Sequence, residues 1–171
     1  MSSEDVEVQA SDEQQYLTFI MAEEEYGVDI LAVQEIRGWE ETTSIPNAPD
    51  YIQGVINLRG TIVPIMDLRR RFGLKPVEYS PITVVIILKV STDQGEKVMG
   101  IVVDAVSDVY SIKHSDVRQP PDLNQDDNSD FLRGLVNVKD KMVILLDVGT
   151  LLTSRHPLEL PSLSEYDPGH A

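Results

Sequence analysis

Residues 52–68, IQGVINLRGTIVPIMDL, contain two short apolar segments that are joined by a tight turn. The two segments, 52–56 and 62–66, are rich in β-branched residues and predict two strands. The turn between them, NLRG (57–60), begins with asparagine and ends with glycine, as a four-residue turn favours. The stretch therefore predicts a β-hairpin with Arg59 at its tip.

The residues after the hairpin predict a short helix. Asp67 is placed to cap the helix LRRRF (68–72), and Gly73 is placed to end it. The strand before the helix, 62–66, is apolar at every position, so we expect it to be buried on both faces. Pro64 cannot donate a ladder hydrogen bond, which predicts a sheet edge or a bulge there.

The hairpin pattern occurs a second time, 80 residues later, in LRGLVNVKDKMVILLDV (132–148). A second repeat has an offset of 73 and aligns residues 27–36 with residues 100–109. Two repeated patterns predict two similar structural units. The ungapped matches of the first repeat include Gly54 with Gly134, Asn57 with Asn137, Val63 with Val143, and Asp67 with Asp147.

Each unit has about five short strands and one short closing helix, which is typical of a small closed barrel. We therefore expect a mainly β protein made of two five-stranded barrels packed together. The first is expected at about 16–80 and the second at about 81–153; an exchange of strands between them is left open. Residues 1–15 predict a disordered acidic arm, and residues 154–171 a C-terminal tail.

Composition narrows the functional classes. The 171 residues include 29 acidic and 14 basic side chains, a formal net charge of −15, and no cysteine. Nucleic-acid binding needs a basic surface, so we expect no nucleic-acid partner. No apolar stretch approaches the ~18 residues of a membrane span. The acidic N-terminus also lacks the pattern of a secretion signal, so we expect a cytoplasmic protein without direct membrane insertion.

Motifs for catalysis are absent from the sequence. HExxH, GxSxG, GxxxxGK[ST] and GxGxxG do not occur, so no motif indicates a zinc site, a serine nucleophile or a nucleotide cradle. We expect no enzyme, no metal and no cofactor. Arg59 is either an ordinary exposed turn residue or a contact for a partner. The basic residue Lys139 at the same place in the second copy favours a contact.

Three segments together resemble the CheW family of chemotaxis coupling proteins. They are EYGVDILAVQEIRGW (25–39), the longer stretch 45–73 around NLRG, and MGIVVDAVSDV (99–109). The similarity extends from about Tyr16 to Leu152. It implies a CheW-like domain of two intertwined, SH3-like barrels with short helices.

The resemblance implies a non-enzymatic adaptor in bacterial chemotaxis. Such proteins link the cytoplasmic tip of methyl-accepting chemoreceptors to the histidine kinase CheA, whose regulatory domain has the same fold. They are cytoplasmic and are recruited to the inner face of the membrane through receptor arrays. An adaptor for another chemosensory-type kinase pathway is the alternative.

The resemblance also implies particular contact residues. The receptor-binding positions correspond to Val33, Glu35, Ile36, Arg59 and Val109. Two further positions, Val84 and Gly100, are expected to be sensitive to the kinase or another partner.

Overall fold

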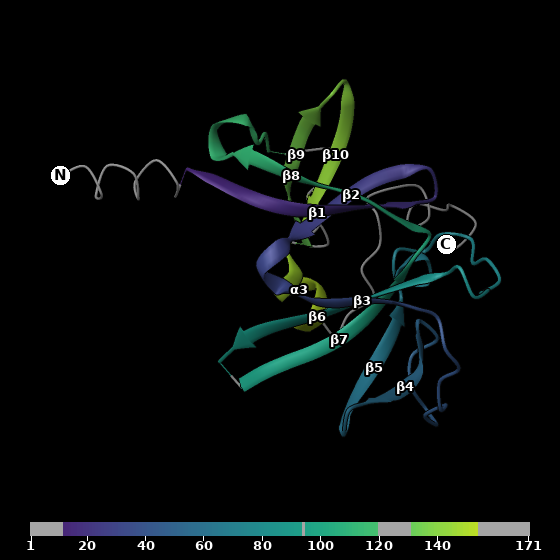
Figure 1. Cartoon of the computed structure of the whole chain (residues 1–171). Coiled ribbons are helices and arrows are strands. Elements are labelled where there is room, and N and C mark those ends of the chain that lie inside the picture. Colours follow the sequence, from purple (N-terminus) through teal and green to yellow (C-terminus); the bar gives the residue numbers. More distant parts are fainter. Residues whose placement is uncertain (1–11, 94, 120–130, 154–171) are drawn as a thin grey trace, which may run out of the picture.

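The computed structural model describes residues 12–93, 95–119 and 131–153. Most of the predicted acidic arm and the whole C-terminal tail lie outside the described residues. Within the described residues, ten strands form two five-stranded sheets (Figure 1). The mainly β fold predicted from the sequence is confirmed.

The first sheet, called the first barrel below, has the strand order β8-β1-β2-β10-β9. Its strands are β1 (Glu13–Met21), β2 (Glu24–Asp29), β8 (Ala105–Lys113), β9 (Leu132–Val138) and β10 (Lys141–Leu146). β1 begins at Glu13 rather than at Tyr16. Residues 13–15, which the sequence places in the acidic arm, therefore belong to the sheet and pair with β8, where Glu13 lies opposite Lys113.

The second sheet, called the second barrel, has the order β3-β6-β7-β5-β4. Its strands are β3 (Val33–Gly38), β4 (Ile52–Leu58), β5 (Thr61–Asp67), β6 (Val84–Thr92) and β7 (Gly95–Val103). The short helices are η1 (Ile30–Ala32), α2 (Leu68–Arg71), η2 (His114–Asp116) and α3 (Val148–Thr153). Among the described residues, no helix is long and apolar enough to cross a membrane.

In each sheet, a residue that follows one edge strand forms a β-bridge with the edge strand on the opposite side. In the second barrel, Thr43 follows β3 and exchanges two backbone hydrogen bonds of 2.9 Å with Val55 of β4. In the first barrel, Arg118 follows β8 and exchanges two bonds of 2.8 Å with Leu135 of β9. These bridges pair backbone groups that an open sheet would leave at its edges.

Neither barrel is formed by one continuous part of the chain. The first barrel takes strands from both 16–80 and 81–153, so the division at about residue 80 does not separate the sheets. Each sheet combines strands from both parts of the chain. Asp29 caps η1 by accepting a hydrogen bond from Leu31 N, and this turn carries the chain from β2 into β3 of the other barrel.

The two sequence repeats correspond to equivalent strand pairings. Ile56 lies opposite Val63 in β4–β5, and their counterparts 80 residues later, Val136 and Val143, lie opposite each other in β9–β10. The parallel strand pairings of the two barrels are related by both sequence offsets, 80 and 73. Ile65 lies opposite Gly100 between β5 and β7, as Leu145 lies opposite Gly27 between β10 and β2. The duplication is therefore structural as well as sequential.

The hairpin turn is one residue displaced from its predicted place. Leu58 pairs with Thr61, which leaves Arg59 and Gly60 as the loop, with φ angles of 50° and 90°. A two-residue loop with two positive φ angles matches the twist of its strands, whereas a type I turn, which asparagine first and glycine last favour, would splay them. Asn57 still stabilises the turn, because its Oδ1 accepts a hydrogen bond from Gly60 N at 2.7 Å.

The predicted helix cap is confirmed. Asp67 Oδ1 accepts hydrogen bonds from Arg69 N and Arg70 N at 3.0 and 3.4 Å, and α2 ends before Gly73, whose φ is 75°. The prediction that 62–66 is buried on both faces is wrong for Ile62, which is 60 % exposed. Ile62 lies close to the hairpin tip, outside the part of β5, Ile65 to Asp67, that pairs with β7.

Within the described part of the chain, buried apolar side chains form three clusters. The largest, called the central cluster, combines residues of both barrels with residues of α2 and α3 and holds the barrels together. The other two fill the interior of one barrel each. The second-barrel cluster contains Ile56, Val63 and Ile65, and the first-barrel cluster contains their counterparts Val136, Val143 and Leu145.

Candidate functional site

A β-bulge in strand β3 changes which of its side chains share a face of the strand. The register shifts between Val33 and Glu35, so that Val33 and Ile36 lie opposite Leu88 and Ile86, which belong to the central cluster. Glu35 instead lies opposite Ile87 of the second-barrel cluster. Residues opposite each other share a face of the sheet. The bulge therefore directs the two apolar side chains of β3 to the side facing the first barrel, and Glu35 to the other side.

An ion-pair network joins β3 to the β4–β5 hairpin tip. Arg59 Nη2 lies 2.5 Å from Glu35 Oε1, and Arg37 Nη1 lies 3.1 Å from Glu35 Oε2. Arg37 also contacts Glu40 Oε1 at 3.3 Å. The hydrogen bond from Arg59 lowers the pKa of Glu35 below its ordinary value, so the carboxylate remains charged at neutral pH.

The ion pair leaves charge and apolar surface accessible on the second barrel. The Arg59 side chain is 67 % exposed although Glu35 holds its guanidinium. Ile36, on the opposite face of the same strand, is 45 % exposed. Ile36 thus lies on the side of β3 that faces the first barrel, whereas Glu35 and Arg59 form what we call the Glu35–Arg59 surface. They lie on a strand and a tight turn, which hold them in fixed positions.

The remaining predicted residues have varied surroundings. Val33 is half-buried and packs against the central cluster, as does Val84 at the start of β6. Val109 is 44 % exposed and lies on β8 of the first barrel. Gly100 is buried, and an added Cβ would lie 2.7 Å from Ile65 Cδ1. Gly100 is therefore a packing position inside the second barrel and not part of an exposed surface.

The first barrel carries a partial copy of this surface. The two offsets align Glu35 with Asp108, and Arg59 with Lys139. The charges are arranged differently, because Lys139 Nζ lies over the Tyr110 ring, 5.5 Å from its centroid. Sequence reasoning recognised the recurring basic tip but missed Arg37. The spacing of Arg37 from Glu35 could have indicated its role, because residues two apart on a strand share a face.

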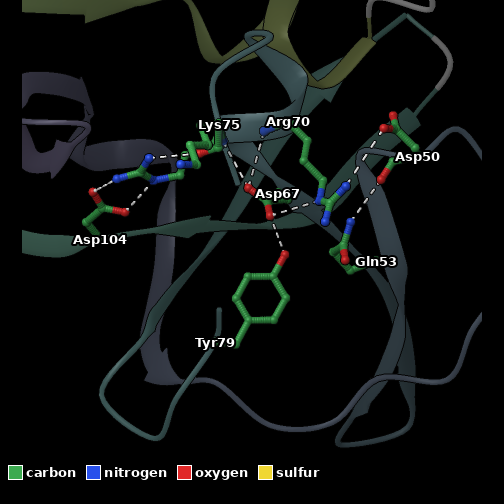
Figure 2. Close-up of polar contacts among 8 residues, drawn as sticks. Asp50, Gln53, Asp67, Arg70, Lys75, Tyr79 and Asp104 are labelled. Carbon is green, nitrogen blue, oxygen red and sulfur yellow. Dashed lines mark hydrogen bonds and ion pairs between the residues drawn. The ribbon is translucent and has the colours of Figure 1, made fainter. Parts of the chain in front are cut away.

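A second polar network, which the sequence did not predict beyond its cap, surrounds Asp67 (Figure 2). The Asp67 carboxylate is buried, accepts a short hydrogen bond from the Tyr79 hydroxyl and lies 3.5 Å from Arg70 Nε. Burial and the bond to Asp67 raise the pKa of Tyr79 well above its ordinary value. Arg70 reaches Asp50 at 3.9 Å, and Gln53 donates to the Asp50 carbonyl oxygen.

These groups are paired with one another by charge or by hydrogen bonds and hold elements together. Each acid of the two networks has a basic or hydroxyl partner, as a structural network requires. In the described part of the chain, no group of three or more histidine, aspartate or glutamate side chains is arranged to hold a metal ion. The fold and its exposed surface define a duplicated two-barrel β protein that displays charged and apolar side chains on rigid strands.

The comparisons with known proteins identify the family. The CheW-like domain model matches residues 15–156. The chemotaxis protein CheW of Klebsiella aerogenes is 48 % identical over 141 residues, which cover 82 % of each chain. That of Rhizobium meliloti is 37 % identical over 81 % of this chain and 86 % of its own. The crystal structure of the scaffolding protein TtCheW from Thermoanaerobacter tengcongensis has a TM-score of 0.71 and 34 % identity, covering 83 % of this chain and 89 % of that one.

The chain belongs to the CheW-like family, a family of chemotaxis coupling and scaffolding proteins.

Proposed function

We propose that this protein is a non-enzymatic adaptor that couples methyl-accepting chemoreceptors to the histidine kinase CheA. The observation that carries the proposal is the Glu35–Arg59 surface, a charged hairpin tip fixed by an ion pair, together with the exposed Ile36 on the other face of β3. Family membership supplies the chemotaxis context. The protein would be cytoplasmic and would reach the inner face of the membrane through receptor arrays.

The receptor contact would extend over both barrels. The receptor tip is a helical hairpin, and a helix is held by apolar contacts that charged residues flank. Val33 and Ile36 of the second barrel and Val109 of the first would supply apolar contact. Glu35 and Arg59 would set the register of the helix and exclude partners with the wrong charge.

The kinase contact would depend on the shape of the second barrel, which is held as a rigid body. Val84 and Gly100 are proposed to be partner-sensitive through the shape of the second barrel, since Val84 is half-buried and Gly100 is buried. A regulatory domain with the same fold would meet a barrel whose strands these two positions hold in place. Co-purification of this protein with a CheA-type kinase and a receptor fragment tests the proposal. A complex with the receptor alone, without kinase, would contradict the adaptor role.

Arg59→Ala is expected to weaken binding of a receptor cytoplasmic fragment by about tenfold, or ~1.4 kcal/mol, because a charged contact at the rim is lost. The free energy of unfolding should change by less than ~0.5 kcal/mol, since an exposed ion pair contributes little. Titration calorimetry and urea denaturation measure the two effects. Lys139→Ala, at the equivalent tip of the first barrel, is the control and should bind normally. Equal losses in both variants would contradict a specific role for Arg59.

Ile36→Asp is expected to weaken receptor binding at least ~30-fold, or ~2 kcal/mol, because an apolar contact is replaced by a carboxylate that must be desolvated. Ile36 is a sharper probe than Val33, whose packing against the central cluster would mix folding with binding. Met142→Asp is the matched control, since Met142 is also exposed and occupies the place of Ile62 in the first barrel, 80 residues later and away from the Arg59 hairpin. Both variants should show an unchanged circular dichroism spectrum. Unweakened binding by Ile36→Asp would place the receptor elsewhere.

A further inference from the structure

A bidentate ion pair lies where the chain crosses from the second barrel to the first. Arg69 Nε and Nη2 of α2 donate to the two carboxylate oxygens of Asp104, at 3.0 and 2.7 Å. Figure 2 labels Asp104 and draws these two contacts as dashed lines. The third nitrogen of the guanidinium, Nη1, donates to the Lys75 carbonyl oxygen at 2.9 Å. The two side chains are only 17 % and 28 % exposed. This geometry distinguishes the pair from an ordinary surface salt bridge.

Asp104 contacts both barrels at once. It is the single residue between β7 of the second barrel and β8 of the first. Its Oδ2 also accepts a hydrogen bond from Ala22 N at 2.9 Å, and its own N donates to Ile20 O at 3.1 Å. Ala22 lies in the β1–β2 turn with a φ of 54°, a conformation that the bond from its backbone N helps to hold. We call this arrangement the Arg69–Asp104 clamp.

The duplicated fold lacks this clamp at the equivalent place. The offset of 80 aligns Arg69 with Gly149, and the offset of 73 aligns Asp104 with Leu31. Neither replacement can form an ion pair, and Leu31 is 86 % exposed. A directional polar contact therefore joins the two barrels at the Arg69–Asp104 place. The equivalent place, at Gly149 and Leu31, lacks this ion pair.

We propose that Arg69 and Asp104 are positioning residues that set the angle between the two barrels. The central cluster holds the barrels together, but apolar contact is non-directional and does not select one angle. Charge-assisted hydrogen bonds with fixed geometry do select one. The clamp thereby fixes the separation between the Glu35–Arg59 surface and Val109. This last consequence rests on the proposed function, whereas the effect on the angle does not.

The angle can be measured directly because the protein has no cysteine. Ser91→Cys on β6 and Ser111→Cys on β8 place one spin label on each barrel at exposed positions. Pulsed electron–electron double resonance then reports the distribution of distances between the two labels in the free protein. The labelled parent should give one narrow distribution. Arg69→Gln and Asp104→Asn should each broaden or shift it, and the double variant should resemble the single ones because both remove the same contact.

Arg70→Gln is the matched control. Arg70 is the next residue of the same helix, and its ion pairs reach Asp50 and Asp67 beside the second barrel rather than the crossing. Its distribution should equal that of the parent. An unchanged distribution in Arg69→Gln, or an equal change in Arg70→Gln, would overturn the proposal, and thermal unfolding must show that each labelled variant is folded at the temperature used.

Receptor binding separates this inference from the proposed function. If the receptor contacts both barrels, Arg69→Gln should weaken its binding several-fold although neither clamp residue belongs to the predicted contact set. A changed distance distribution with unchanged receptor affinity would keep the clamp and contradict a receptor contact that extends over both barrels. An unchanged distribution with weakened binding would overturn the clamp and leave the proposed function standing.

Discussion

Gly54→Ala should lower the free energy of unfolding by about 4 kcal/mol, because backbone strain is added to the loss of the contacts that close the second barrel. Gly54 has a φ of 132°, which a residue with a side chain rarely adopts. An added Cβ would lie 2.4 Å from the Thr43 carbonyl oxygen and 2.8 Å from Thr42 Oγ1. Thr43 would have to move, and its two hydrogen bonds to Val55 would be lost.

Urea denaturation measures this loss, and Gly60→Ala provides the comparison. Gly60 also has a positive φ, 90°, but no heavy atom lies within 4 Å of its added Cβ. The control should therefore cost only about 1 kcal/mol, the strain alone. Gly134→Ala in the first barrel should cost less than Gly54→Ala, because Gly134 has no positive φ and adds no backbone strain, although its Cβ would lie 2.4 Å from Val117 Cγ1 and 3.0 Å from the Arg118 carbonyl oxygen. Equal, small losses in Gly54→Ala and Gly60→Ala would show that barrel closure does not depend on close backbone approach.

Asp67→Ala should lower the free energy of unfolding by about 3 kcal/mol, because it removes a helix cap and leaves a partly buried hydroxyl without its partner. The cap serves the backbone N atoms of Arg69 and Arg70, and the hydroxyl is that of Tyr79. Urea denaturation at neutral pH measures the change.

The repeat supplies the control for this second prediction. Asp147 occupies the equivalent position before α3, where its Oδ1 accepts a hydrogen bond from Thr150 N at 3.1 Å. Asp147→Ala should therefore cost about 1 kcal/mol, the ordinary value of a cap. Adding Tyr79→Phe to Asp67→Ala should recover part of the loss, since no hydroxyl is then left unpaired. Equal costs for the two aspartates would show that the buried network adds nothing to the cap.

Local features of the fold were predictable because they depend on neighbouring residues. Asp67 caps a helix through contacts within three residues, and Arg59 lies in a turn whose strands are adjacent in the chain. The one-residue error in the turn arose because the twist of the strands, rather than the preference of single residues, selects the turn type. The exposure of Ile62 depends on where the neighbouring strands end, which no local pattern records.

The residues of the candidate site were proposed from the sequence, whereas their arrangement in space could not be predicted from it. Glu35 and Arg59 were named through resemblance to a family, and their ion pair joins residues 24 apart in the chain. Arg37 was missed although residues two apart on a strand share a face, because its role depends on the Glu35 carboxylate that Arg59 also contacts. Gly100 was expected to be partner-sensitive, and only its distance to Ile65 shows that it lies inside the barrel.

By itself, the sequence determined the duplication, the hairpins, the helix caps and the mainly β class, because periodicity and turn chemistry act over a few residues. Only the tertiary structure decided which strands share a barrel. The parallel pairings of β5 with β7 and of β2 with β10 join segments far apart in the chain, and local preference carries no information about them. The same holds for the Arg69–Asp104 clamp: a bidentate ion pair requires two side chains to meet in space, and their meeting depends on how the whole chain packs.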